Sequence, residues 1–135
     1  MRIDLDDMNP PVEFPYGEDG ASVTLRVCAG DDIRAIEKKR PGKVEYKNGQ
    51  RFEYVPKDVE ERRNEDIWDF CLVSWKGLVN KDEEPIPCTR ENKVLLMGKS
   101  VVFARFIAES LSKLREDIEA KEEELGKNRR TLLGG

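Results

Sequence analysis

The sequence predicts an α+β fold, with a small antiparallel sheet of hairpins in the N-terminal half and a helical C-terminal half that ends in a long helix. Several segments within residues 12–55 alternate apolar and polar side chains with a two-residue period, which is typical of strands. From Pro56 onward the apolar spacing changes to three and four residues, which is typical of helices. The 135 residues fit one domain. The expected organisation is a flexible acidic arm over 1–11, one domain over 12–125 (hairpin-rich over 12–55, helical over 57–125) and a flexible tail over 126–135.

Two strands are predicted first, over residues 12–14 and 22–28, around the turn-rich segment 17–20. The second strand alternates cleanly and places three apolar residues on one face: Val23, Leu25 and Val27. That face is therefore expected to be buried. A short helix follows, because Asp31 or Asp32 can cap its start. Pro41-Gly42 then ends that helix.

The dipeptide Asn48-Gly49 is the strongest local indication of a β-hairpin in the sequence. It separates the alternating segments 44–47 and 51–55. The central residues of a two-residue hairpin turn must accept positive φ, which asparagine and glycine do most readily. We therefore predict a β-hairpin over 44–55.

A helix is predicted over residues 57–75, with Gly77 as its stop. Five of its residues share one face by their spacing: Ile67, Trp68, Cys71, Leu72 and Trp75. Phe70 and Val73 fall outside that face, so the helix is apolar on more than one side. Such a helix is either central in the fold or half of an interface. The candidate protein-binding residues are Trp68, Phe70, Val73 and Trp75.

Two more helices are expected after the extended segment 78–88. Thr89 can cap a short helix that Gly98 closes, and Ser100 can cap the last one. The apolar residues of the last helix fall on a single stripe: Phe103, Ile107, Leu111, Leu114 and Ile118. This stripe is expected to cover the rest of the core.

The residue types and motifs of the chain give little support for a catalytic function. The chain contains no histidine, which removes the commonest general base and the commonest zinc ligand. Cys28, Cys71 and Cys88 lack the two-residue spacing of thiol metal sites, and no phosphate-binding glycine motif occurs. Residues 80–84 lack the alternating ligands of a calcium loop. We therefore expect no enzyme activity, no catalytic residues, no cofactor and no specific metal.

The net charge and the apolar content of the chain indicate which classes of partner it is expected to bind. A net charge of −4 and a pI near 5.1 argue against nucleic acid, which selects clustered Lys and Arg. The N-terminus has no apolar signal segment, and no stretch approaches the ~20 apolar residues of a membrane span. Three widely spaced cysteines suit a reducing compartment. A cytoplasmic location with neither nucleic acid nor membrane as partner is expected.

A family resemblance lies between Asn64 and Leu114. Its segments are Asp66–Phe70, Leu72–Leu78, Pro85–Thr89, Glu91–Lys93, Leu95–Leu96 and Phe103–Ile107. They form a helix that ends at a Trp-Lys-Gly turn, an acidic loop, a proline-containing extension, a Thr-capped helix and an amphipathic helix. This order resembles phage tail assembly chaperones and related prophage tail proteins. The family pattern has a glycine near Glu83 or Glu84, where this chain has glutamate.

The resemblance implies a non-enzymatic protein-binding factor of virion morphogenesis in the bacterial host cell. Such a factor associates with the tape measure protein and the tail tube protein before the tube polymerises, and it shields apolar helices from aggregation. One alternative is a minor structural or adaptor component of the tail. Another is an uncharacterised host enzyme or regulator. Homo-oligomer formation is left open by the sequence.

Overall fold

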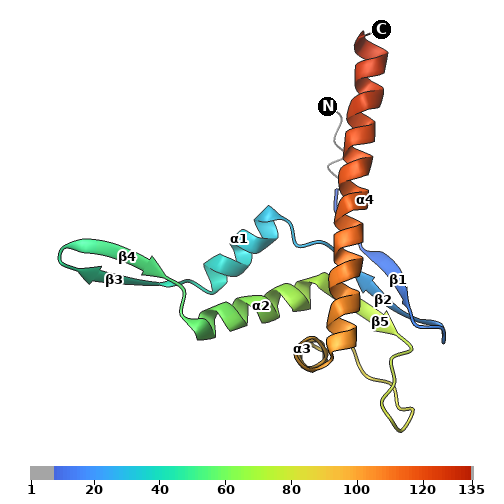
Figure 1. Ribbon diagram of the computed structural model, residues 1–135, viewed down its shortest axis with the longest axis horizontal. Helices are drawn as coiled ribbons and strands as arrows, with labels where there is room; N and C mark the ends of the chain where they lie inside the picture. Colours follow the sequence, from blue (N-terminus) through green and yellow to red (C-terminus); the bar gives the residue numbers. More distant parts are fainter. Residues whose placement is uncertain (1–7, 135) are drawn as a thin grey trace.

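The computed structural model describes the backbone of residues 8–134 and the side chains of residues 8–125. Its elements are, in chain order, β1 (Val12–Tyr16), β2 (Ala21–Leu25), α1 (Gly30–Lys39), β3 (Lys43–Lys47), β4 (Gln50–Tyr54), α2 (Lys57–Cys71), β5 (Leu72–Lys76), α3 (Arg90–Lys99) and α4 (Val101–Gly134). Small antiparallel sheets take most of their strands from the N-terminal half, helices dominate the C-terminal half, and the chain ends in a long helix, so the predicted α+β class is confirmed (Figure 1).

The two ends of the chain were both predicted to be flexible. Residues 1–7 of the predicted arm lie outside the described residues. Within the rest of the arm, the Asn9 side chain donates a hydrogen bond to the Val27 carbonyl (2.5 Å) and accepts one from the Val27 amide (3.2 Å). Of the predicted tail, 126–135, the backbone through Gly134 belongs to α4, and its side chains lie outside the description.

A three-stranded antiparallel sheet, in the order β1-β2-β5, forms one side of the body. Tyr16 pairs with Ala21 across the turn 17–20, in which Gly17 and Gly20 have φ of 76° and 79°. These left-handed conformations are open to glycine without strain, so the turn can be tight. The central strand, β2, carries Val23 and Leu25 in the core, as its alternation predicts, whereas Val27 lies beyond the end of the strand and is only half-buried.

The strand β5 corrects the predicted helix over 57–75, because α2 ends at Cys71 and residues 72–76 are extended. Leu25 pairs with Leu72 whereas Thr24 pairs with Ser74, so Val73 is an extra residue in the ladder. Such a β-bulge lets Leu72 and Trp75, three positions apart, both face the core. The three-residue spacing that predicted a helix is therefore produced by a bulged strand.

The core lies between this sheet and α4, which crosses it in Figure 1. Its buried members are Val23, Leu25, Cys28, Cys71, Leu72, Trp75, Phe103 and Ile107. Edge-to-face ring contacts join Phe103 to Tyr16 (centroids 5.7 Å apart) and to Trp75 (6.2 Å). The Trp75 indole also donates a 2.7 Å hydrogen bond to the Ile86 carbonyl, which holds the loop after β5 against the core.

The predicted caps of the last two helices are confirmed. The Thr89 hydroxyl accepts a hydrogen bond from the Asn92 amide, and the Ser100 hydroxyl accepts one from the Phe103 amide, both at 3.2 Å. The acidic turn before α3 places Glu83 at a φ of 59°, a conformation that glycine adopts most easily. No helix within residues 8–134 is long and apolar enough to cross a membrane.

Residues 29–65 form an extension that leaves the body. It consists of α1, the β3–β4 hairpin and the first part of α2, and it carries the hairpin well away from the sheet and α4 (Figure 1). No residue from 29 to 65 is buried. The extension therefore has no core of its own, and the body supplies the stability of the fold.

Replacing buried side chains on the apolar stripe of α4 by alanine tests whether the body supplies the stability of the fold. We expect Phe103→Ala and Ile107→Ala each to lower the free energy of unfolding by about 2 to 5 kcal/mol, because both side chains are buried in the core. Val102→Ala, one residue away and exposed, is the matched control and should change stability little. Denaturant unfolding of the three variants makes the comparison, and equal losses at all three positions would contradict the placement of the core.

Candidate functional site

The β3–β4 hairpin at the tip of the extension is the candidate site. Asn48 and Gly49 form its turn with φ of 52° and 76°, so the hairpin predicted from Asn-Gly is confirmed. All ten strand residues are exposed, and the two strands form a separate sheet. Within the described residues, neither edge of this ribbon pairs with another strand.

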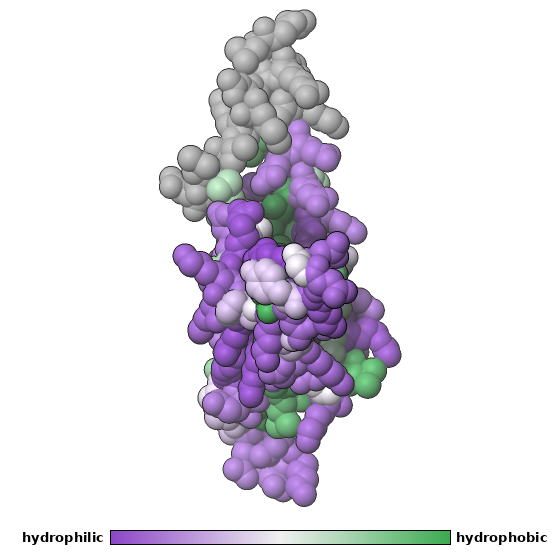
Figure 2. Space-filling model, turned by 90° about the vertical axis from the view of Figure 1, so that its left-hand side faces the viewer, coloured by the Kyte–Doolittle hydropathy of each residue, from purple (hydrophilic) through white to green (hydrophobic). Residues whose placement is uncertain are grey.

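The two faces of the ribbon mix apolar and charged side chains. On one face Phe52 and Tyr54 pair across from Glu45 and Lys43, and on the other Val44 and Tyr46 pair across from Glu53 and Arg51. The exposed fractions of the four apolar side chains range from 42% for Tyr54 to 72% for Tyr46. Viewed from the hairpin end, the described surface is mostly hydrophilic, with small separate apolar areas (Figure 2). The ribbon is therefore amphipathic and uncovered on both faces.

The base of the hairpin is fixed by a close backbone contact. A Cβ atom at Gly42 would lie 2.7 Å from the Tyr54 carbonyl oxygen, so only glycine fits there without a shift of the backbone. A hollow of about 420 Å³ opens beside this contact. Val44 and Val55 line it together with Glu37 and Arg63. The two ends of the ribbon are thus held together where it joins α1 and α2.

Asp66 connects the extension to the body. It is buried on α2, where it accepts hydrogen bonds from Arg40 at the end of α1 (3.1 Å) and from Arg90 at the start of α3 (2.6 Å). Arg63 donates to the Arg40 carbonyl at 2.9 Å. The network continues through Asp69, which pairs with Arg90 (3.5 Å) and with the buried Lys93 (3.1 Å). Three helices are therefore joined by directional polar contacts.

The protonation state of Asp66 follows from its partners. Burial alone would raise its pKa, but the hydrogen bonds from Arg40 and Arg90 outweigh burial and lower the pKa below its ordinary value of 3.8. The carboxylate is therefore ionised near neutral pH and is unsuited to donate a proton. Its arrangement joins helices rather than performing acid–base chemistry.

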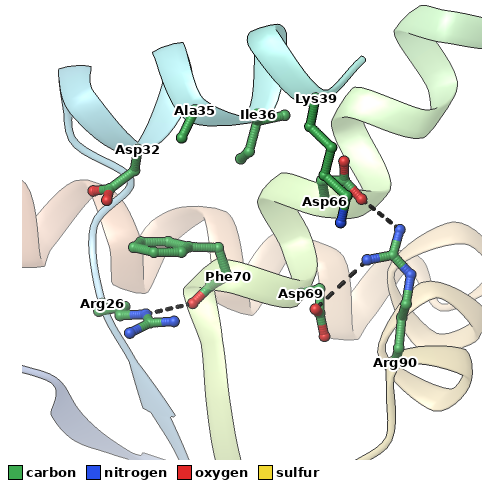
Figure 3. Close-up of a pocket in the computed structure, with 9 residues that line it drawn as sticks. All are labelled: Arg26, Asp32, Ala35, Ile36, Lys39, Asp66, Asp69, Phe70 and Arg90. Carbon is green, nitrogen blue, oxygen red and sulfur yellow. Dashed lines mark hydrogen bonds and ion pairs between the residues drawn. The ribbon is translucent and has the colours of Figure 1, made fainter.

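A groove of about 290 Å³ runs beside this network, between α1 and α2 (Figure 3). Ala35 and Ile36 face it from α1, and the Phe70 ring lies opposite (Figure 3). Arg26 stacks on that ring at 3.8 Å and donates a hydrogen bond to the Phe70 carbonyl at 2.7 Å. The Phe70 ring thus already has a cation stacked on it, and the carboxylates of Asp66 and Asp69 are paired.

The structure separates the four residues that the sequence predicted as a protein-binding surface. Trp75 is 9% exposed and belongs to the core, and Val73, at the β5 bulge, is 38% exposed. Trp68 and Phe70 are half-buried against the core from α2. The four side chains therefore do not form one exposed helical face.

The surroundings of all three cysteines raise the pKa of their thiols. Burial raises the pKa of Cys28, and it raises that of Cys71 to about 11. Burial also raises the pKa of the half-buried Cys88. Since the thiolate is the reactive form, all three are poor nucleophiles near neutral pH. Among the described side chains, no three His, Cys, Asp or Glu residues are placed to hold a metal ion.

Neutralising Asp66 tests the network. The lowered folded pKa means that the carboxylate stabilises the fold above its unfolded pKa, the ordinary value of 3.8, and that this stabilisation is lost as the pH falls through the lower, folded pKa. We expect Asp66→Asn to lower the free energy of unfolding at pH 7 by about 1 to 2 kcal/mol, a moderate loss because both arginines are about one-third exposed. The difference from the wild type should shrink below pH 4. Unfolding measured across pH decides, with the exposed Glu116→Gln as control, and identical pH curves for wild type and Asp66→Asn would contradict the assignment.

The base of the hairpin provides a second test. Gly42→Ala should destabilise the hairpin by about 1 to 3 kcal/mol, because the added methyl group meets the Tyr54 carbonyl. Amide exchange across β3 and β4 should accelerate while exchange in α4 is unchanged. Gly98→Ala is the matched control, since nothing lies near its Cβ position and alanine favours a helix by up to about 1 kcal/mol. Unchanged exchange in β3 and β4 of Gly42→Ala would show that the base can relax.

The chain was compared with protein-family models, with curated proteins and with solved structures. No family model, no curated protein and no solved structure matches it. Its function is therefore inferred from its own residues and from the order of the sequence segments between Asn64 and Leu114.

Proposed function

We propose that this chain is a non-enzymatic protein-binding factor that engages its partner through the β3–β4 hairpin. One observation carries the proposal: four apolar side chains are exposed on a ribbon that no layer of the described residues covers on either face. These are Val44, Tyr46, Phe52 and Tyr54. A two-stranded hairpin is marginally stable alone in water and is normally stabilised by packing against another layer. A partner that covered the ribbon would supply that layer.

The charges around these side chains indicate the kind of partner. Lysines flank Glu45 on one face, and Arg51 and Glu53 form an ion pair of 2.6 Å on the other. The ribbon therefore suits an amphipathic segment whose apolar stripe is bordered by charges of both signs. The resemblance to tail assembly chaperones suggests the apolar helices of a tape measure protein, with the tail tube protein as a further partner. In this proposal the chain acts in the host cytoplasm before the tail polymerises.

The position of the hairpin favours this use. The hairpin lies at the far end of the extension, away from the sheet and α4 (Figure 1). A partner can reach it without displacing the core. Val73, the one exposed residue among the four first predicted, lies on β5 in the body and offers a competing surface.

Charge placed on the ribbon tests the proposal. We expect Tyr46→Asp and Val44→Asp to weaken capture of a co-expressed tape measure fragment at least about tenfold, because each puts a charge where an apolar side chain becomes covered. Binding to the purified fragment is measured by titration calorimetry. Both positions are exposed in the free chain, so thermal unfolding should stay close to the wild type.

Two matched variants complete the experiment. Val101→Asp, exposed at the start of α4, should bind as the wild type does. If Val73→Asp alone abolished binding, the interface would lie on β5 and the hairpin proposal would be wrong. If the wild type bound no tail protein at all, the proposed function itself would fail. Absence from purified tail particles would favour an assembly factor over a structural or adaptor component.

A further inference from the structure

The two free edges of the hairpin differ in what they can pair with. We infer that β4 pairs with β4 of a second copy of this chain, antiparallel about a two-fold axis at Phe52. The result is a continuous sheet in the order β3-β4-β4-β3. This inference goes beyond the proposed function, because it concerns the edge of the ribbon rather than its faces.

The register of the hairpin determines which backbone groups face outward. Lys47 and Gln50 flank the two-residue turn and form the hydrogen-bonded pair that closes it. By alternation, Phe52 and Tyr54 also direct their amides toward β3. Arg51 and Glu53 therefore direct their amide and carbonyl groups toward the free edge of β4. These are the groups that a second strand would bind.

Pairing about Phe52 places complementary side chains opposite each other. Arg51 of each copy lies across from Glu53 of the other, in pairs that exchange backbone hydrogen bonds. On the opposite face the two Phe52 rings meet in a non-hydrogen-bonded pair, in which side chains are closest. Gln50 of each copy lies beside Tyr54 of the other. Every direct pair across the axis is thus either oppositely charged, aromatic or polar with aromatic.

In the equivalent register, the free edge of β3 does not offer such complementary pairs. The equivalent two-fold pairing of β3, about Glu45, would place Glu45 against Glu45 and Lys43 against Lys47. Like charges directly opposite each other destabilise a strand pair. Charged edges of this kind are a device that keeps sheets from extending indefinitely. Charges therefore disfavour this register at the β3 edge, whereas they favour the equivalent one at the β4 edge.

The free chain already holds the charged residues in a suitable position. Arg51 and Glu53 lie on one face, and their side chains are 2.6 Å apart and more than half exposed. In the dimer, the Arg51–Glu53 ion pair of one copy would lie beside that of the other copy. Positive and negative side chains would then alternate across the axis. Two five-residue strands bury less than the ~800 Å² per partner of a standard interface, so the dimer is expected to be weak and concentration-dependent.

The edge and the faces can be tested separately. Val44 and Tyr46 lie on β3, away from the paired edge, and remain available in the dimer. Tyr46→Ser removes the apolar ring without placing a charge opposite Arg51, so it should leave self-association intact while it weakens capture of the tape measure fragment. Self-association is measured on the chain alone and capture on the chain with the fragment, so either result can fail without the other.

Sedimentation velocity of the full chain, from micromolar to millimolar concentration at low salt, tests the inference. The wild type should pass from monomer to dimer. Arg51→Glu alone and Glu53→Arg alone place like charges across the axis, and each should raise the dissociation constant about tenfold or more. An equimolar mixture of the two variants restores opposite charges at every pair and should form a heterodimer. The double variant Arg51→Glu/Glu53→Arg should dimerise as the wild type does.

The controls separate charge pairing from general effects. Arg34→Glu makes the same change of charge at an exposed position on α1 and should dimerise normally. Recovery in the mixture shows that both single variants keep a folded hairpin. A wild type that stays monomeric throughout, or single variants that dimerise like it, would overturn the inference. Variants that fail to recover on mixing, or oligomers larger than dimers, would also overturn it.

Discussion

The position of the extension depends on one buried carboxylate. Asp66 accepts hydrogen bonds from Arg40 and Arg90 and so joins the ends of α1 and α3 to the middle of α2. Residues 29–65 contain no buried residue, although Ile36 of α1 packs partly buried against the core. Directional polar contacts therefore act together with this packing to hold the extension. Every buried side-chain nitrogen and oxygen in the described part of the chain has a hydrogen-bond partner, which is the condition under which a polar centre can be stable.

The molecule therefore has two parts, one stabilised by apolar burial and one that remains exposed. In the body, β2, the bulged β5 and α4 exclude water around Leu25, Leu72 and Ile107, and this burial supplies the stability. In the extension, the Asn48-Gly49 turn and the contact at Gly42 shape a ribbon that remains exposed. In the proposed function, stability and recognition therefore lie in separate segments. A change in the ribbon can alter association while the core stays intact.

Sequence reasoning succeeded where the cause of a structure is local. The Asn48-Gly49 turn, the Thr89 and Ser100 caps and the α4 stripe each depend on residues only a few positions apart. It failed at β5, because the bulge at Val73 gives Leu72 and Trp75 the spacing of a helix. The Asp66 network joins residues 24 and 26 positions apart, a pairing that no local pattern shows. The candidate site was missed because alternation predicts that a strand is half-buried and cannot show that a whole hairpin has no layer to pack on.

The central claim is that the ribbon over residues 43–54 is covered when the chain associates with its partners. Residue-resolved amide hydrogen exchange measures this most directly, in the chain alone at low concentration and with a tape measure fragment added. The account predicts that the amides of β3 and β4 exchange readily in the free chain and become protected in the complex, while those of α4 near Phe103 and Ile107 are protected in both. Strong protection of β3 and β4 in the free monomer, or a complex that protects only the body, would contradict it.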